Sequence, residues 1–479
     1  MFKIIYPEKD ATLYESLPTY NTGLDEILEV GKRLGDSGSY YYKSRSVIKF
    51  DMADVNSALT KYSVDLDDCK FVLQLYTSHA KNLPSNYTID ANIVGDDWTN
   101  GTGLANVSTA VTDGVTWDNP KSGSYYWTSG SQYIQFPVPT AGSLVKLSNA
   151  SSFNATGSAP GTFVVSSSNT NVTASIVLDT TSSFTTAAVV SATGSFNIND
   201  TIIFPTGSLG ATNSGGTNLT FTVNASDIRS ASSLYISGSG KGGSWLYQSG
   251  SGIYSASFYS QSFFDQPGMN ISESFSYRPT DVNMDVTGAV KTWINGSGGF
   301  TIPNYGFILK FSDADEEDTA VSGYVRFFSR ETHTIYVPRL TMYFDKSSFV
   351  TGSLSAYDSD SYTVYTQLKK EYKDTAVTKI RIYARDKYPQ KSPTNKFPFT
   401  TVKYLPSNTL YSLRDAATDE VIIPYDIDYT KVSCDSTGNF VYVDMSGLMP
   451  ERYYRLEFKV IDGFMENYIE DEFFFKVVR

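Results

Sequence analysis

Hydrophobic residues in this chain recur in short runs that are separated by turn-forming residues, and the clearest series lies between residues 285 and 344. It opens with an amphipathic run in which Val286, Val290 and Trp293 share one helical face. A polar, glycine-rich break follows. Three β-type runs come next, at 305–311, 324–331 and 337–344. Runs of this length between turns predict the closing strands of a β-sandwich.

The first 138 residues carry runs of the same kind. They lie at 2–6, 11–14, 26–30, 46–51, 70–76, 91–94 and 133–136. Short strands at this spacing favour a sandwich over alternating β and α units. We therefore expect these N-terminal strands to complete the sheets that the strands of 285–344 close.

The composition changes between residues 139 and 244, where Ser, Thr, Gly, Asn, Ala and Val predominate and charge almost vanishes. Disordered segments usually combine high charge with few β-branched residues, which this segment does not. Short β-type runs recur in it, at 163–165, 174–178, 187–190, 201–204 and 218–223. The segment is therefore expected to be a β-rich insertion in the first sandwich, which would resume over 245–346.

The C-terminal part begins after a Ser-rich stretch, 347–364, that is typical of a linker. Residues 365–479 regain charge and carry β-type runs, one of which places Tyr454, Leu456, Phe458 and Val460 on one face. A tyrosine-bearing strand that follows Pro450 is typical of the tyrosine corner of immunoglobulin-like and fibronectin-like sandwiches. The sequence therefore predicts an all-β chain with a second, independent β domain.

Composition and charge narrow the functional classes. The chain has 479 residues, 14% aromatic and 18% charged residues, and a net charge of −12. No cluster of Lys and Arg supplies the basic surface that nucleic-acid binding requires. No apolar run reaches about 18 residues and no signal peptide is evident, so neither membrane insertion nor secretion is expected. Cys69 and Cys434 are expected to remain thiols.

Residues with catalytic or ligand chemistry are few. His79 and His333 are expected at the surface, with no zinc-binding pattern around them. Residues 238–243 resemble a phosphate-binding loop, but Gly242 replaces the Ser or Thr that must follow Lys241. The acidic run 313–318 is expected to be a solvated turn, with a calcium site as the alternative. We predict no catalytic, cofactor-binding or metal-binding residue and no cofactor, hence no enzyme.

Aromatic residues are the remaining candidates for a binding site. They are Trp98, Trp117, Tyr125, Tyr126 and Trp127. Aromatic side chains on loops at a sandwich edge stack on sugars, but they also fill cores and protein interfaces. Both interpretations stay open at the level of sequence.

Several motifs resemble, in their order, those of the DNRLRE family of β-sandwich domains. In the first half these are Ala11-Thr-Leu-Tyr14, Asn21-Thr-Gly23, Leu28-Glu-Val-Gly31, Arg45-Ser-Val-Ile-Lys-Phe-Asp51 and 71–76. In the second half these are 117–120, 285–293, 304–309, Phe328-Ser-Arg-Glu331 and Pro338-Arg-Leu-Thr341. The resemblance implies a jelly-roll-like, carbohydrate-binding-module-like fold over 1–138 and 245–346, in which Arg330 and Glu331 are framework residues.

The C-terminal domain resembles a terminal module of virion structural proteins from contractile-tailed cyanobacterial and marine bacteriophages. The motifs are Ala384-Arg-Asp-Lys-Tyr-Pro389, 414–424, 429–434 and Pro450-Glu-Arg-Tyr-Tyr454. The resemblance implies a virion component assembled in the host cytoplasm, released by lysis, and bound to other virion proteins in a symmetric multi-copy assembly. Attachment to host surface glycans is the alternative. A third hypothesis, that the chain is a polysaccharide-cleaving enzyme, is supported only by the abundance of acidic and aromatic residues.

Overall fold

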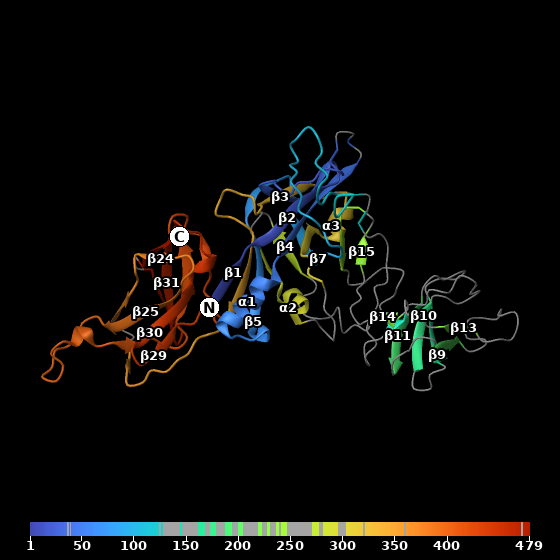
Figure 1. Ribbon diagram of the computed structural model, residues 1–479. Helices are drawn as coiled ribbons and strands as arrows, with labels where there is room; N and C mark the ends of the chain where they lie inside the picture. The colour runs from blue at the N-terminus through green and yellow to red at the C-terminus, as the bar shows by residue number, and fades with distance from the viewer. Residues whose placement is uncertain are drawn as a thin grey trace. The chain divides into compact units, whose positions relative to one another are not determined.

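The computed structural model describes residues 1–123, 126–127, 241–246, 271–276, 281–295, 303–358, 361–470 and 473–479, apart from residues 36, 37, 39 and 320 (Figure 1). Between residues 128 and 240 it describes residue 200 and a set of strands. Strands make up 45% of the structure and helices 10%, in antiparallel and mixed sheets. The prediction of a mainly β chain is confirmed at this level.

The chain divides into two compact units, each built from segments that are distant in sequence. The first unit comprises Met1–Tyr6, Ala53–Leu73 and Arg339–Arg479. The second unit comprises Pro7–Met52 and Gln74–Pro338.

The second unit contains an eight-stranded sheet in the order β17-β7-β19-β4-β3-β20-β6, with β2 paired to β4. Its strands are β2 (Pro7–Tyr14), β3 (Ile27–Leu34), β4 (Tyr41–Phe50), β6 (Thr77–Lys81), β7 (Asn86–Ile93), β17 (Ser272–Ser276), β19 (Phe307–Phe311) and β20 (Gly323–Phe328). β19 lies between β4 and β7, and β20 lies between β3 and β6. The expectation that the N-terminal strands share a sheet with strands between residues 285 and 344 is confirmed.

The helix expected near Trp293 is α2 (Thr287–Asn295), which follows β18 (Val282–Asp285). The Asp285 carboxylate accepts the backbone N–H of Thr287 at 3.0 Å, which satisfies a free donor at the helix start. Val286, Val290 and Trp293 are buried, as the pattern predicts. In the first unit, α1 (Met52–Tyr62) was not anticipated, because its buried face offers little more than Val55 and Ala58.

The Ser/Thr-rich segment contains a five-stranded sheet in the order β11-β10-β9-β12-β13. Its strands are β9 (Gly161–Ser167), β10 (Thr173–Leu178), β11 (Ala187–Thr193), β12 (Thr201–Phe204) and β13 (Leu219–Thr222). Two short pairs accompany it: β8 (Leu144–Val145) with β14 (Ile228–Arg229), and β15 (Ile236–Gly238) with β16 (Ser244–Leu246). The five strands predicted here are confirmed, whereas the run expected at 133–136 lies outside the described residues.

Two six-stranded sheets form most of the first unit. One consists of β22 (Ser355–Ala356), β23 (Tyr362–Thr366), β25 (Val377–Asp386), β26 (Lys403–Tyr404), β29 (Ser433–Asp435) and β30 (Gly438–Asp444). The other consists of β24 (Glu371–Lys373), β27 (Leu410–Asp415), β28 (Val421–Ile423), β31 (Tyr453–Asp462), β32 (Met465–Ile469) and β33 (Phe474–Val478). In addition, β1 (Phe2–Ile5) pairs with β21 (Arg339–Phe344), which neighbours β5 (Cys69–Leu75). Single 3₁₀ turns occur at Leu66–Asp68, Pro398–Thr400 and Met445–Gly447.

The core of the first unit follows the alternation read from the sequence. Tyr454, Leu456, Phe458 and Val460 of β31 are all buried in one hydrophobic cluster. The Tyr454 hydroxyl donates to the backbone carbonyl of Met449 at 3.0 Å, which is the hydrogen bond of a tyrosine corner. Burying this ring therefore leaves no unpaired hydroxyl group.

The stretch 347–364, expected as a linker, makes backbone hydrogen bonds within the first unit. Val350 N–H donates to the Cys434 carbonyl at 3.0 Å, and Cys434 N–H donates to the Ser348 carbonyl at 2.8 Å. Cys69 and Cys434 are buried thiols that form no disulfide. None of the described helices is long and apolar enough to cross a membrane.

Candidate functional site

The acidic run 313–318 forms a short helix rather than the solvated turn expected from its charge. α3 (Asp313–Glu317) begins after Ser312, whose hydroxyl accepts the backbone N–H of Asp315 at 3.2 Å. Asp313 pairs with Lys310 at 2.5 Å, and Glu316 is buried. Within the described residues, no group of three or more His, Cys, Asp or Glu side chains is placed to hold a metal ion. The carboxylates of this helix instead serve local structure.

Glu316 forms a buried ion pair with Arg45 of β4. The Arg45 Nε and Nη2 atoms lie 2.9 and 2.5 Å from the two carboxylate oxygens, and Nη1 donates to the Gly242 carbonyl at 2.7 Å. Burial alone would raise the pKa of Glu316, but the Arg45 guanidinium lowers it below its usual range. The guanidinium also lies over the rings of Trp117 and Trp245, 5.3 and 5.0 Å from their centroids. The charged groups of Arg45 and Glu316 are therefore paired with each other and hold loops against the sheet.

The tryptophans considered for sugar stacking are core residues. Trp98, Trp117 and Trp127 pack in one hydrophobic cluster with residues of β2, β4 and β19. The indole N–H of Trp98 donates to the Tyr305 carbonyl at 2.8 Å, and that of Trp127 to the Thr116 carbonyl at 3.0 Å. Tyr126 is exposed, whereas Tyr125 lies outside the described residues. The three indoles therefore present no face for a ligand.

A second buried carboxylate, Glu29 of β3, lines a pocket of about 230 Å³ on the same sheet. Its oxygens pair with Arg33 and, at 2.8 Å, with Arg326. The Ser44 hydroxyl donates to it at 3.1 Å. With two guanidiniums already bound, this carboxylate is a structural ion-pair partner rather than a proton acceptor for a substrate.

The remaining sequence candidates lie in non-catalytic settings. His79 and His333 are exposed, as expected. In the glycine-rich stretch near Lys241, the Gly242 N–H donates to the Trp117 carbonyl at 2.6 Å, and Lys241 pairs with Asp118 at 2.9 Å. The described part of this stretch is therefore an ordered turn over the tryptophan cluster, as the missing Ser or Thr implies.

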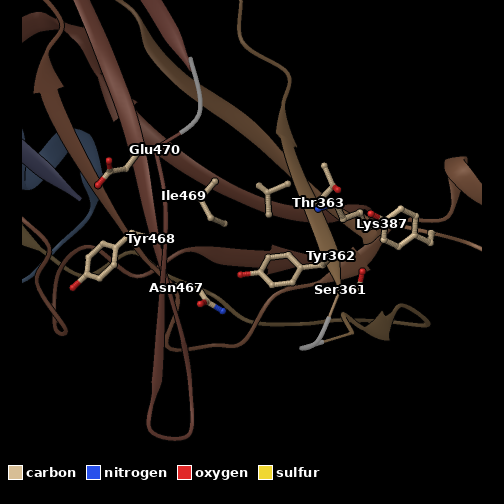
Figure 2. A pocket seen from close by; sticks show the side chains of 10 residues that line it. Ser361, Tyr362, Thr363, Lys387, Asn467, Tyr468, Ile469 and Glu470 are labelled. Carbon is tan, nitrogen blue, oxygen red and sulfur yellow. The ribbon is translucent and has the colours of Figure 1, made fainter.

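A groove of about 670 Å³ lies in the first unit, between β23 and β32 (Figure 2). Tyr362 of β23 and Asn467 of β32 lie close together across it and share a side-chain hydrogen bond. Lys387 and Tyr388, which follow β25, line the side near β23, and Glu470 lines the side near β32. The groove is open and mixes aromatic rings with polar and charged groups.

Exposed aromatic side chains gather on the connecting segments of the first unit. The long loop between β25 and β26, residues 387–402, carries Tyr388, Phe397 and Phe399, which are 73%, 74% and 54% exposed. At the tip of the β31–β32 hairpin, Phe464 is fully exposed and Met465 is 56% exposed. Apolar groups this accessible on ordered segments usually mark contact surfaces between proteins. We call residues 387–402 the aromatic loop.

Sequence reasoning did not single out the aromatic loop, although a signal was present. Its aromatic residues alternate with Pro389, Pro393 and Pro398 and with lysines, and they follow neither a helical nor a strand period. Prolines prevent such a stretch from joining a sheet ladder, so its rings have no sheet face to pack on. The tryptophans attracted more attention because of their size, yet they are the buried set.

A scan against protein-family models and a search of curated proteins found no match to this chain. The resemblances to DNRLRE domains and to phage virion modules therefore remain expectations that rest on the quoted motifs.

Proposed function

We propose that the chain is a non-enzymatic structural component of a bacteriophage virion, held in the tail, baseplate or neck by contacts with other virion proteins. The observation that carries this proposal is the display of Tyr388, Phe397, Phe399 and Phe464 on ordered segments of the first unit. Such rings are the side chains that contribute most to protein–protein binding. A protein that is held in an assembly by contacts with other proteins needs exposed anchor side chains of this kind and needs no catalytic residues.

The disposition of charged groups supports the same proposal. Three buried glutamates, Glu29, Glu316 and Glu457, are each paired with arginine side chains. Charges paired in this way position strands and loops, and breaking them would damage structure rather than turnover. In a scaffold or adaptor protein, all of these ion pairs serve to hold the structure together.

The finer fold assignments belong to this proposal. We assign a jelly-roll-like sandwich, of the DNRLRE type, to residues 1–138 and 245–346, and an immunoglobulin-like sandwich to 365–479. The Tyr454–Met449 hydrogen bond supports the second assignment. The interleaving of β4, β7 and β19 supports the first, because it requires strands from both sides of the inserted segment.

Mass spectrometry of purified phage particles tests the proposal directly. Peptides of this chain at a fixed ratio to known tail proteins are the expected result. Density that fits the two β units at a symmetric position in the intact particle would locate it. Absence of the chain from particles that are otherwise complete would refute the proposal.

Binding of host surface glycans is a second candidate, and the groove between β23 and β32 favours it. An exposed tyrosine beside asparagine and carboxylate side chains is a common arrangement at sugar sites. A glycan array with the intact protein and with Tyr388→Ala tests this candidate. Binding that disappears in the variant supports it, whereas a blank array with the unchanged protein removes it.

A further inference from the structure

The aromatic loop is held by hydrogen bonds between its own polar groups, and two of its exposed rings lie beside cations, Phe399 under Arg385 and Tyr388 under Lys387. The Asn395 amide side chain donates to the Thr401 hydroxyl at 3.0 Å, and its backbone N–H donates to Ser392 Oγ at 2.9 Å. The Thr400 hydroxyl donates to the Phe397 carbonyl at 2.7 Å, and Pro398 between the two phenylalanines is buried. The loop therefore holds its rings outward before any partner arrives, which lowers the entropy lost on binding.

The same loop carries positive charge, on lysines that form no ion pair with a carboxylate of the described residues. Lys387, Lys391 and Lys396 lie within it, and no Asp or Glu occurs between residues 387 and 403. Lys403 at its end pairs with Asp386 at 2.7 Å, but none of the carboxylates that the structure describes pairs with the three loop lysines. A surface that combines exposed rings with free ammonium groups fits an apolar partner surface that carries carboxylates.

A surface of that complementary kind is present on the same unit, in the turn between β28 and β29. Ile427 is 61% exposed at its tip, between half-buried Asp426 and exposed Asp428. The Asp426 carboxylate fixes the turn by accepting the backbone N–H groups of Asp428 and Tyr429, at 2.8 and 3.1 Å. The turn thus presents one aliphatic side chain flanked by negative charge. We call residues 426–428 the acidic turn.

The strand register places these two surfaces at opposite ends of one sheet. β25 and β29 both run antiparallel to β30, so they are parallel to each other. Ile382 of β25 and Cys434 of β29 both face Asn439 of β30, which fixes their level along the sheet. The aromatic loop follows the C-terminal end of β25, whereas the acidic turn precedes the N-terminal end of β29. One molecule cannot bring the two together, but two copies can.

We propose that the aromatic loop of one chain docks on the acidic turn of a second copy of this chain. Two different surfaces meet in such a contact, so it is head-to-tail, and repetition produces a ring or a row of copies. Phe397 and Phe399 cover Ile427, while the loop lysines face Asp428. The inference does not depend on the virion assignment, because a chain absent from phage particles would still self-associate.

Charge reversal tests the proposal better than salt does. With a net charge of −12, two copies repel each other, so added salt weakens both the local attraction and this repulsion. The loop variant is therefore Lys387→Glu/Lys391→Glu/Lys396→Glu. The turn variant is Ile427→Lys/Asp428→Lys, which leaves Asp426 in place because its carboxylate holds the turn.

Sedimentation velocity of the full chain over a wide concentration range is the measurement. The unchanged protein should show a mass that rises with concentration, and each variant alone should weaken association roughly tenfold or more. An equimolar mixture of the two variants should associate again, because glutamates of one loop then meet lysines of the other turn. The control variant is Lys369→Glu/Lys370→Glu/Lys373→Glu, three exposed lysines near β24 with the same change in charge, and it should associate normally.

Three outcomes would overturn the proposal. One is an unchanged protein that stays monomeric at all concentrations. The second is a loop variant that associates as strongly as the control variant. The third is a mixture of loop and turn variants that does not associate although circular dichroism shows both to be folded.

Discussion

Asp10 makes the stability of the second unit depend on pH in a direction opposite to that of most carboxylates. It lies on β2 with 1% of its surface exposed, and its carboxylate accepts the backbone N–H of Arg330 at 2.7 Å. Burial raises the pKa of Asp10 from 3.8 to about 7, although the hydrogen bond from Arg330 opposes the rise. The folded protein thus holds a proton on Asp10 at pH values where the unfolded chain has lost it.

The sign and size of the effect follow from this difference in proton binding. Between pH 4 and 7 the native state binds more protons than the unfolded state, so the free energy of unfolding falls as pH rises. A pKa difference of about three units corresponds to ~4 kcal/mol in total. Part of this is already lost by pH 5, because the unfolded carboxyl titrates near 3.8, and about 2–3 kcal/mol remains to be lost between pH 5 and 9.

The variant Asp10→Asn removes this titration while keeping an oxygen that can accept the Arg330 N–H. Urea unfolding monitored by tryptophan fluorescence is suited to the measurement, because all five tryptophans lie in the second unit. Burial also raises the pKa of Asp90 to about 6, so the unchanged protein alone does not isolate Asp10. The informative quantity is the difference in unfolding free energy between variant and unchanged protein at each pH.

That difference should shift by about 2–3 kcal/mol in favour of Asp10→Asn between pH 5 and 9. Parallel curves for Asp10→Asn and the unchanged protein would refute the reasoning, because they would show that Asp10 is ionised in both states throughout.

Four further predictions concern other features of the fold. Replacing Arg45 by Met should destabilise the second unit by about 3 kcal/mol, because the buried Glu316 loses its bidentate partner and keeps only Lys43 at 3.5 Å. Adding Glu316→Leu should recover part of the loss in urea unfolding. Trp98→Ala should lower stability by about 3–5 kcal/mol through a cavity, and any glycan binding measured under conditions where the variant is folded should be unchanged. Tyr454→Phe should destabilise the first unit by about 1 kcal/mol, seen in its thermal unfolding by circular dichroism. A fragment of residues 1–244 should be insoluble, because β19 and β20 are missing from the sheet, and a soluble, folded fragment would contradict this.

The strands could be predicted because period-two alternation and turn residues are local signals. β19, β31 and the five strands of the Ser/Thr-rich sheet all overlap the runs read from the sequence. α1 could not be predicted in the same way, since its buried contacts rest on Val55 and Ala58 among polar residues. A helix with so little apolar surface is specified by the structure around it rather than by its own pattern.

The chemistry of the charged residues was not predictable for a different physical reason. Arg45 and Glu316 are 271 positions apart, and nothing local in 313–318 distinguishes the buried Glu316 from the four acids around it, three of which are exposed. The partner of a charge depends on strand order, which brings β4 beside β19 and so places α3 near Arg45. The sequence therefore predicted a solvated acidic segment, which holds for Asp313, Glu317 and Asp318, but it did not predict that Glu316 is buried.

Aromatic residues show what additional sequence signal would have distinguished the core from the surface. Trp98 and Trp117 lie on loops, yet their loops cross the sheet and are covered by Trp245 and Arg45. Phe397 and Phe399 lie on a loop that is closed by its own hydrogen bonds and interrupted by prolines, and both rings stay mostly exposed. Whether a ring is buried depends on its segment. A segment that is held by its own local hydrogen bonds cannot also pack its rings against the strands. Lysines and prolines interleaved with aromatic residues indicate a segment that does not pack against strands. This pattern predicts an exposed contact surface, whereas an isolated tryptophan does not.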